Sequence, residues 1–594
     1  MIASMTKYSF VLLNGQQENL LEQLQEIGLV DITRSAKPID DTSQKLAGEV
    51  ELLDGLIHGL NSAVIPEGVT PEYIDGDIVR LAGGQIMRYS EDTVEIKVLE
   101  REVHHLKAWG QFDGSQIKAL EEAGVHLHFH VVSKKNFKPQ WEQQYPLAVI
   151  SIGKNTVRFV VVGEDPLPGE VPAPEFSVQE KEEELATKRK HFEKTLGRIA
   201  SAKERIPELE ALRLQALEKL DLYLAGVTAS TAAEDTIVTL VGYAPTESDE
   251  TVTEALDKIG VLYIKEEAQA QDNPPITFRN NWFVRQFEVL TDMYGRPAYN
   301  GFDPTPFISV FFLLFFALCM GDAGYGLVLI VIGLMLKKVP SFKDMAPLVV
   351  LLGGGTVIAG FFLHTFFSID IAEWKIFEPV KFLFLPNEIA GYAGGMVLSI
   401  VVGIIHLCLA MVVKAIQAVK VKGFEASLGT LGWTLLIVGG VIVGGFALAG
   451  VLSSEITKWI IIAIGVVSAL GIFVFNDPDR NKFANVGMGL WDTYNTVTGL
   501  LGDVLSYLRL YALGLAGSML GMAFNDMGGM VLGDGSNPIL WVPFIVLVLL
   551  GHTLNVAMCA LGAFVHPLRL NFLEFFKNSG YEAAGRNYTP LKKQ

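Results

Sequence analysis

Apolar residues are distributed very unevenly along this chain of 594 residues. Before residue 300 they occur in short runs between charged stretches, and from residue 305 onward they form eight long segments. A helix needs about 20 apolar residues to cross a bilayer. The pattern predicts an α-helical polytopic membrane domain over residues 301–594. Its segments lie near 305–320, 323–336, 345–369, 390–419, 427–452, 456–475, 490–530 and 538–576.

The last two segments are longer than a bilayer is thick. A straight helix over residues 490–530 would be about 60 Å long, roughly twice the hydrocarbon thickness. Because such a mismatch is penalised, we expect this segment to be strongly tilted or broken. The eighth segment raises the same expectation.

Residues 1–300 predict α/β lobes joined by an antiparallel coiled-coil rod. Period-two alternation or short apolar runs indicate strands at 7–13, 125–132 and 146–162, and residues 236–266 read as strand, helix and strand. Helical stretches at about 41–60 and 177–224 carry heptad spacing, which requires a partner helix. Ordinary amphipathic helices of a compact domain are the alternative. The heptad positions are Leu46, Val50, Leu53, Ile57 and Leu60, and then Val178, Leu185, Phe192, Ile199 and Ile206.

Histidines and cysteines give little support for a metal site. His126, His128 and His130 share one face of the strand at 125–132, and we expect that face to be solvated rather than metal-binding. The three cysteines lie far apart within apolar segments, which is typical of packed core residues and not of a disulfide framework. No cofactor is expected.

Charge divides the chain in the same way as hydropathy. Half of the residues are hydrophobic, and the mean hydropathy is +0.35. The first 300 residues hold 30 Lys+Arg against 48 Asp+Glu, and the remainder holds 17 of each. An acidic soluble half argues against nucleic acid, because that affinity depends on clustered cations. No phosphate-binding loop motif occurs, so the chain is not expected to hydrolyse ATP by itself.

Loop charges predict the orientation. With the N-terminal half and the C-terminus in the cytoplasm, the inner loops and tail hold twelve Lys+Arg and the outer loops three. This bias satisfies the positive-inside rule for eight spans. The inner residues are Lys337, Lys338, Lys343, Lys414, Lys420, Lys422, Arg480, Lys482, Lys577, Arg586, Lys592 and Lys593.

Arg509, near the middle of the seventh segment, is the main candidate for chemistry. A charge at mid-membrane costs at least about 2.5–3.5 kcal/mol and normally faces a partner, a cavity or a pathway. Asn495 precedes it on nearly the same helical face. Small residues follow it and favour the close approach of another helix. They are Gly514, Gly517 and Gly521.

The eighth segment has a polar stripe along one face. Its spacing of three and four residues aligns the side chains on a helix, which indicates a hydrated path or a static network between the last two segments. The stripe comprises His552, Asn555, Cys559, Gly562, His566 and Arg569. Weaker candidates are Asp503, His364, His406 and Lys414.

Four motifs together resemble the large membrane subunit of V/A-type rotary ATPases, called a in eukaryotes and I in bacteria and archaea. They are SYLRLYALGLAGSML, GHTLNVAMCALGAFVHPLRLNFLEFFKNSG, GIIHL and YGRPAYNGFDPTPF, and VGYAP and NPPITFRN extend the resemblance into the soluble half. Residues 1–235 are similar only in organisation.

The resemblance implies a stator subunit in a bacterial or archaeal plasma membrane. Arg509 would face a proteolipid ring, and Gly514, Gly517 and Gly521 would pack close to that ring. Arg569 and His566 would match the second motif, and the soluble half would contact peripheral stalks and the central-stalk adaptor. Some relatives have a histidine at the place of Gly517 and acids at the places of Asn495 and Cys559, so roles in lining a channel are not transferred. The transported ion, H⁺ or Na⁺, is not specified.

Two other classes of protein remain open. A secondary transporter or channel with a cytoplasmic regulatory domain would need a membrane acid that binds the ion alone, and Asp503 and Asp492 come nearest. A membrane anchor without transport would suit the coiled coil and leaves Arg509 unexplained.

Overall fold

The computed structural model describes residues 1–593 except 14, 36, 74–75, 111–113, 164–166, 174–175, 233–236, 340–341, 373, 390, 476–481 and 534–535. Arg480 and the side chains of Lys422 and Lys482 lie outside the described part. The chain forms two compact units, one of residues 1–10, 29–31 and 241–590 and one of residues 11–28, 32–240 and 591–594. The domain boundary expected near residue 300 stays a prediction.

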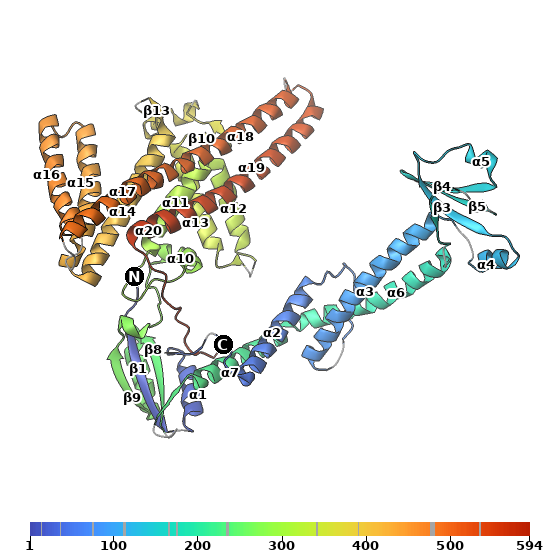
Figure 1. The fold of residues 1–594 in the computed structure, drawn as a ribbon, viewed down its shortest axis with the longest axis horizontal. Coiled ribbons are helices and arrows are strands. Elements are labelled where there is room, and N and C mark those ends of the chain that lie inside the picture. Colours follow the sequence, from blue (N-terminus) through green and yellow to red (C-terminus); the bar gives the residue numbers. More distant parts are fainter. Residues whose placement is uncertain are drawn as a thin grey trace. The chain divides into compact units, whose positions relative to one another are not determined.

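Two sheets form the β-structure of the first 300 residues (Figure 1). One has the order β2-β8-β1-β9, with β7 paired to β8, and the other has the order β4-β5-β3-β6. The expected strands are present, and residues 236–266 form strand, helix and strand. The bounds are β1 Met5–Leu13, β2 Asp31–Ile32, β3 Leu127–Ser133, β4 Leu147–Ile152, β5 Thr156–Val162, β6 Glu170–Val171, β7 Ser230–Ala232, β8 Ile237–Pro245, α8 Asp249–Ile259 and β9 Leu262–Glu267.

The histidine face of β3 is only partly solvated. His130 is fully buried and stacks on Phe159 at 4.9 Å between ring centroids, so the expectation of a solvated face is wrong at this position. His128 lies 2.7 Å from a carboxylate oxygen of Glu170. Among the described residues, no group of three or more His, Cys, Asp or Glu side chains is arranged to hold a metal ion.

Four helices build the rod, α2 Asp41–Ser62, α3 Ile78–Lys107, α6 Val178–Glu204 and α7 Ile206–Val227. α2 packs on α7 and α3 packs on α6. Ion pairs such as Arg189–Glu100 and Lys107–Glu182, both 2.7 Å, show that α3 and α6 are antiparallel. The sequence pattern did not predict α3, because its core-facing positions include the buried polar residue Asp92.

Capping boxes lie at the N-termini of two helices of the rod, α2 and α6. The Asp40 side chain accepts a hydrogen bond from the Ser43 amide at the start of α2, and Ser177 and Glu180 do the same for α6. Such reciprocal bonds satisfy amides that a helix start leaves unpaired. A 2.6 Å bond from the Tyr223 hydroxyl to Asp40 and the bond from Ser43 lower the pKa of that carboxyl to about 2.

The charge on Asp40 makes the stability of α2 depend on pH. Because the pKa is depressed on folding, its stabilisation is present above the ordinary value of 3.8 and is lost as the pH falls towards 2. Asparagine also caps helices well, so Asp40→Asn isolates the charge. The variant should unfold at a lower temperature than the parent at neutral pH, and the difference should vanish near pH 2.

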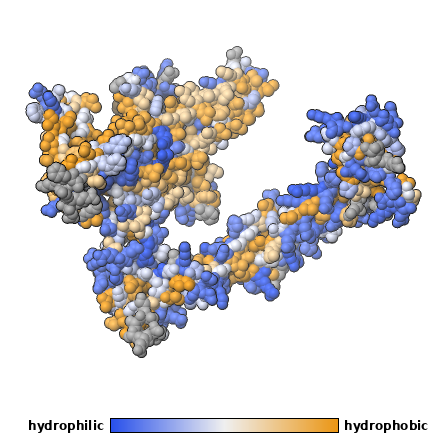
Figure 2. All heavy atoms as spheres, in the orientation of Figure 1, coloured by the Kyte–Doolittle hydropathy of each residue, from blue (hydrophilic) through white to orange (hydrophobic). Residues whose placement is uncertain are grey.

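The hydrophobic segments form the helices of the membrane domain, α11 Thr305–Met320, α12 Ala323–Leu336, α13 Ala346–Phe362, α14 Gly394–Lys422, α15 Leu428–Leu448, α16 Ser454–Phe473, α17 Lys482–Ser506, α18 Leu508–Leu532 and α19 Trp541–Arg569. Within the described residues, five helical stretches are long and apolar enough to cross a membrane, and α11, α12 and α13 are shorter. Figure 2 shows apolar surface over the α15–α16 pair and along α18 and α19. Eight crossings stay a prediction.

Short elements complete the fold. Two small hairpins, β10–β11 and β12–β13, lie between α13 and α14. The core of the membrane domain lies around α11, with Phe312 and Phe315 fully buried. The remaining bounds are α1 Gln17–Ile27, α4 Gly114–Glu122, α5 Trp141–Gln144, α9 Trp282–Arg285, α10 Glu288–Tyr294, β10 Thr365–Phe366, β11 Ile369–Asp370, β12 Glu388–Ile389, β13 Tyr392–Ala393, a π-helical turn Leu570–Phe575 and α20 Phe576–Ser579.

Candidate ion-translocation site

The long seventh segment is broken two residues before Arg509. α17 ends at Ser506 and α18 begins at Leu508, and Tyr507 lies between them. The Tyr507 amide donates to Val504 O at 3.1 Å and the Leu510 amide donates to Tyr507 O at 3.1 Å. These bonds span three residues, as in a 3₁₀ turn, and so tighten the helix locally. The segment is therefore interrupted at one residue, Tyr507, which keeps helical angles of φ −75° and ψ −18°, and strong tilt stays a prediction.

Tyr507 is anchored in the core and holds this break in place. Its side chain is fully buried, and its hydroxyl is 2.9 Å from His406 Nδ1 on α14. A β-carbon at Gly403 would lie 2.3 Å from the Tyr507 ring, so only glycine allows this approach. His406 is also fully buried and stacks on Phe575 at 4.8 Å. The interpretation of His406 as a packed, hydrogen-bonded residue is supported by this geometry.

Arg509 follows the break and has no ion pair within the described part of the chain. Its Nη1 atom is buried and donates no hydrogen bond there. The side chain as a whole is half-buried. A cation buried without a counter-charge is costly in an apolar environment. Arg509 therefore lacks a counter-charge among the described residues.

The end of α19 brings His566 and Arg569 towards Arg509. His566 is close enough to both arginines to feel their charges, and its Nδ1 is buried without a hydrogen-bond partner among the described residues. Arg569 is exposed. The π-helical turn Leu570–Phe575 follows at once, and such turns are frequent at functional sites.

Glu574 is a candidate that the sequence analysis missed. It lies on the π-helical turn, is 5% exposed, and its Oε2 has no hydrogen-bond partner within the described residues. The available signal was a single acid inside the apolar run of residues 572–576. A buried membrane carboxylate near the Arg569 charge is a candidate functional group for the same reason as a buried arginine.

His552 and Asn555 belong to a hydrogen-bond network that joins α12, α18 and α19. Asn555 Nδ2 donates to Gly517 O and to the Tyr325 hydroxyl, both at 2.8 Å. The Tyr325 hydroxyl is 2.8 Å from His552 Nδ1, and His552 Nε2 is 2.9 Å from Asn525 Oδ1. Both ring nitrogens of His552 therefore have partners, which is typical of a network that fixes helix positions.

Asp322, at the start of α12, is a second residue that the sequence analysis missed. Its buried carboxylate accepts bonds from the amides of Tyr325 at 3.1 Å, Phe367 at 2.9 Å and Ser368 at 2.6 Å. Phe367 and Ser368 have positive φ angles of 47° and 59°, a strained backbone for residues other than glycine. The carboxylate therefore holds the turn between β10 and β11 against α12.

The expected role of the glycines on α18 needs correction. A β-carbon at Gly514 would lie 2.9 Å from Leu318 O, one at Gly517 2.6 Å from Cys559 Sγ, and one at Gly521 2.0 Å from Ser368 Oγ. These glycines allow close packing inside the chain. They do not face an adjoining ring, because α11, α19 and the β10–β11 turn cover them.

Two cavities lie along the broken helix, one on each side of Arg509 in the sequence. The α17 cavity, of about 290 Å³, is lined by Asn495 and Asp503 of α17 and by Lys577. The α18 cavity, of about 260 Å³, is lined by Tyr511 and Ser518 of α18, among others.

Asp503 is paired at the wall of the α17 cavity. Its carboxylate oxygens are 3.4 Å from Lys577 Nζ, and Asn578 Nδ2 donates to one of them at 2.8 Å. His364 lines the α18 cavity and lies 3.0 Å from both Asp370 Oδ1 and Asn387 Oδ1. The structure thus places Asp503 and Lys414 at the α17 cavity and His364 at the α18 cavity.

Comparisons with known proteins show what the chain as a whole is similar to. Residues 174–344 match the model of the V-type ATPase 116kDa subunit family. The chain is 27% identical over 649 residues to V-type ATP synthase subunit I 1 of Treponema pallidum, and the alignment covers 100% of both chains. It is 26% identical to V-type ATP synthase subunit I of Borreliella burgdorferi, again over 100% of both. Over its whole length the chain is therefore similar to subunit I of V/A-type ATPases.

Other similarities cover part of the chain. The A-type ATP synthase subunit I of Methanocaldococcus jannaschii is 33% identical over 57% of this chain and 52% of its own length. A crystal structure of the cytoplasmic N-terminal domain of a subunit I aligns with 44% of this chain and 100% of its own, at 14% identity and a TM-score of 0.19. That TM-score is too low to support a shared fold.

These similarities support the general role of the chain as a membrane subunit of a multi-subunit rotary ATPase. Its several membrane-length helices fit that place.

Proposed function

We propose that the chain is the stator of the ion pathway, with Arg509 facing a ring of proteolipid subunits. The observation that carries the proposal is the buried Nη1 of Arg509, which has no partner in the described part of the chain. A ring subunit with an ion-carrying carboxylate supplies the missing anion. A fixed cation favours the ionised, unloaded carboxylate by Coulomb attraction. The ion must leave before the carboxylate passes Arg509, and this couples rotation to transport.

Two stripes of exposed residues, one along α17 and α18 and one along α19, support a surface of the chain that faces the ring. On α17 and α18 the exposed positions follow the helical spacing through Arg509, and on α19 they end near Arg569. Four of the α17–α18 positions are glycine or alanine, which lets another helix approach closely. The stripes consist of Gly502, Leu505, Ala512, Ala516, Met519 and Ala523, and of Leu550, Leu554, Leu561, Val565 and Arg569.

The α17 and α18 cavities serve as the two ion half-channels. Each has polar lining and reaches part of the way along the broken helix, and Arg509 lies between them in the sequence. An uninterrupted path would let ions leak, so two half-channels separated by a fixed cation are what rotary transport requires. In the predicted orientation the α17 cavity faces the cytoplasm and the α18 cavity the opposite side. His566, Arg569 and Glu574 shape the field beside Arg509.

A secondary transporter is the competing function. It requires a membrane acid that binds the ion by itself, and the proposed acid, Asp503, is engaged by Lys577 and Asn578. Asp322 is engaged by three backbone amides. These contacts, and the Arg569 charge near the remaining buried acid Glu574, favour the stator. The deciding experiment is ATP-driven ion uptake into vesicles that contain complexes with Arg509→Ala.

The soluble half is proposed to anchor peripheral stalks and to contact the central-stalk adaptor. Paired helices with charged outer faces suit this, because the rod buries its own heptad positions and leaves charges such as Glu100 and Arg189 at its surface. Residues 1–300 expressed alone should be soluble, elongated in small-angle scattering and able to bind purified stalk proteins. A compact particle that binds none of them would contradict the anchoring role.

A further inference from the structure

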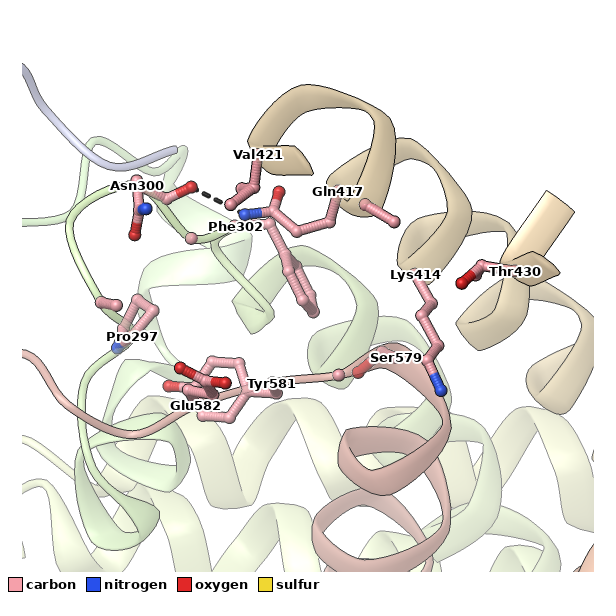
Figure 3. Close-up of a pocket in the computed structure, with 14 residues that line it drawn as sticks. Pro297, Asn300, Phe302, Lys414, Gln417, Val421, Thr430, Ser579, Tyr581 and Glu582 are labelled. Carbon is pink, nitrogen blue, oxygen red and sulfur yellow. Dashed lines mark hydrogen bonds between the residues drawn. The ribbon is translucent and has the colours of Figure 1, made fainter. Parts of the chain in front are cut away.

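A third cavity lies beside the end of α14. This junction cavity, of about 270 Å³, is lined by the loop around Ala298 and Asn300, by α14, and by the residues after α20 (Figure 3). Gln417 Nε2 donates to Asn300 O at 2.7 Å across it. Glu582 contributes a carboxylate to the opposite wall. The cavity is therefore polar and carries an acid.

The junction cavity and the α17 cavity share two wall residues, Lys414 and Thr430. Figure 3 shows the Lys414 side chain extending from α14 between Thr430 and Ser579. A β-carbon at Gly580 would lie 3.7 Å from Lys414 Cγ, so the lysine stem runs close to the backbone there. Lys414 and Thr430 therefore border both cavities.

We propose that the junction cavity is the mouth of the α17 half-channel, with Lys414 as the residue at the constriction. This inference rests on the proposed function, since it gives the α17 half-channel its route to water. Ions pass from Glu582 at the mouth, past Lys414 and Thr430, to Asn495 and Asp503 beside the ring.

The chemistry of the walls fits a cation route. A carboxylate at the mouth raises the local concentration of cations. Lysine has a long flexible stem with a single charged end, so its side chain can move aside without any change of backbone. Its positive charge also slows the passage of cations when the side chain lies across the path. The position of the Lys414 side chain therefore influences the rate at which cations enter.

Thiol labelling of the assembled ATPase tests the route. Ala418 lines only the junction cavity, and Lys420, two residues further along α14, is exposed and lines neither cavity. Each is replaced by cysteine in a transport-competent background that lacks Cys319, Cys408 and Cys559. The reagent is 2-(trimethylammonium)ethyl methanethiosulfonate, added to inverted vesicles. Modified Ala418→Cys should lose ATP-driven uptake by about tenfold or more, because a bulky cation then fills the mouth. Modified Lys420→Cys should keep its uptake.

Ala298→Cys, on the loop at the opposite wall, is the second variant, so the inference does not depend on one substitution. Unchanged uptake after complete modification of both Ala418→Cys and Ala298→Cys overturns the proposed mouth. That result leaves the stator role intact, since Arg509 is tested separately. Loss of uptake in both labelled variants, with Lys420→Cys unaffected, supports the route.

Discussion

Replacing Arg509 with alanine should abolish ATP-driven ion uptake and leave the complex assembled. Within the described residues no acid is paired with Arg509, so its loss leaves no buried partner without a counter-charge. The usual large folding penalty of a broken buried ion pair is therefore avoided. Transport should fall by at least about a hundredfold, because the fixed cation acts on every ring carboxylate that passes.

Arg509→Lys should also fail. Lysine keeps the charge but places it at one ammonium on a flexible stem, whereas the guanidinium presents a planar fork of donors. Lys458→Ala, which removes an exposed cation from α16, is the control and should transport normally. Uptake is measured in vesicles after equal amounts of assembled complex are confirmed by copurification. Normal uptake with Arg509→Ala would refute the stator mechanism.

Disturbing the helix break should impair transport although no charge is changed. Tyr507 is fully buried, and truncating such a large core side chain costs about 3–5 kcal/mol. Tyr507→Ala should therefore release the turn that sets the position of Arg509, and uptake should fall at least about tenfold. Tyr507→Phe keeps the ring and loses only the hydrogen bond to His406, a change of about 1 kcal/mol. Its uptake should stay close to that of the parent.

Gly403→Val tests the same contact from α14. A β-carbon there would lie 2.3 Å from the Tyr507 ring, so valine must push the tyrosine away. The variant should reproduce the Tyr507→Ala defect. Gly440→Val, where an added β-carbon meets no atom within 4 Å, is the matched control on α15. If Tyr507→Ala and Gly403→Val both pump like the parent, the break does not position Arg509.

Local patterns predicted much of this protein. The membrane helices could be read from apolar runs, because each residue that faces lipid must be apolar whatever its neighbours are. Capped heptads such as those of α2 and α6 depend on residues a few positions apart. Arg509 could be identified as a candidate functional residue because a charge is energetically costly in lipid. The length of the seventh segment required a tilt or a break, but the sequence did not show where.

Tertiary structure decided which polar groups find partners. His406 meets Tyr507 across 101 residues, and Asn555 meets Tyr325 across 230. The sequence analysis assigned the wrong packing partner to three glycines of α18, Gly514, Gly517 and Gly521. Small residues favour any close approach, whether inside the chain or between chains. The partner of α6 was missed because α3 buries polar residues.

The amino-acid sequence by itself determined where this protein is apolar, where it is helical and where a cation sits in lipid, since those properties depend on neighbouring residues and on solvent. Only the tertiary structure decided where the seventh helix breaks, which histidines and acids are already paired, and which cavities flank Arg509. The physical reason is that a hydrogen bond or a cavity wall requires side chains from distant segments to meet within a few ångströms.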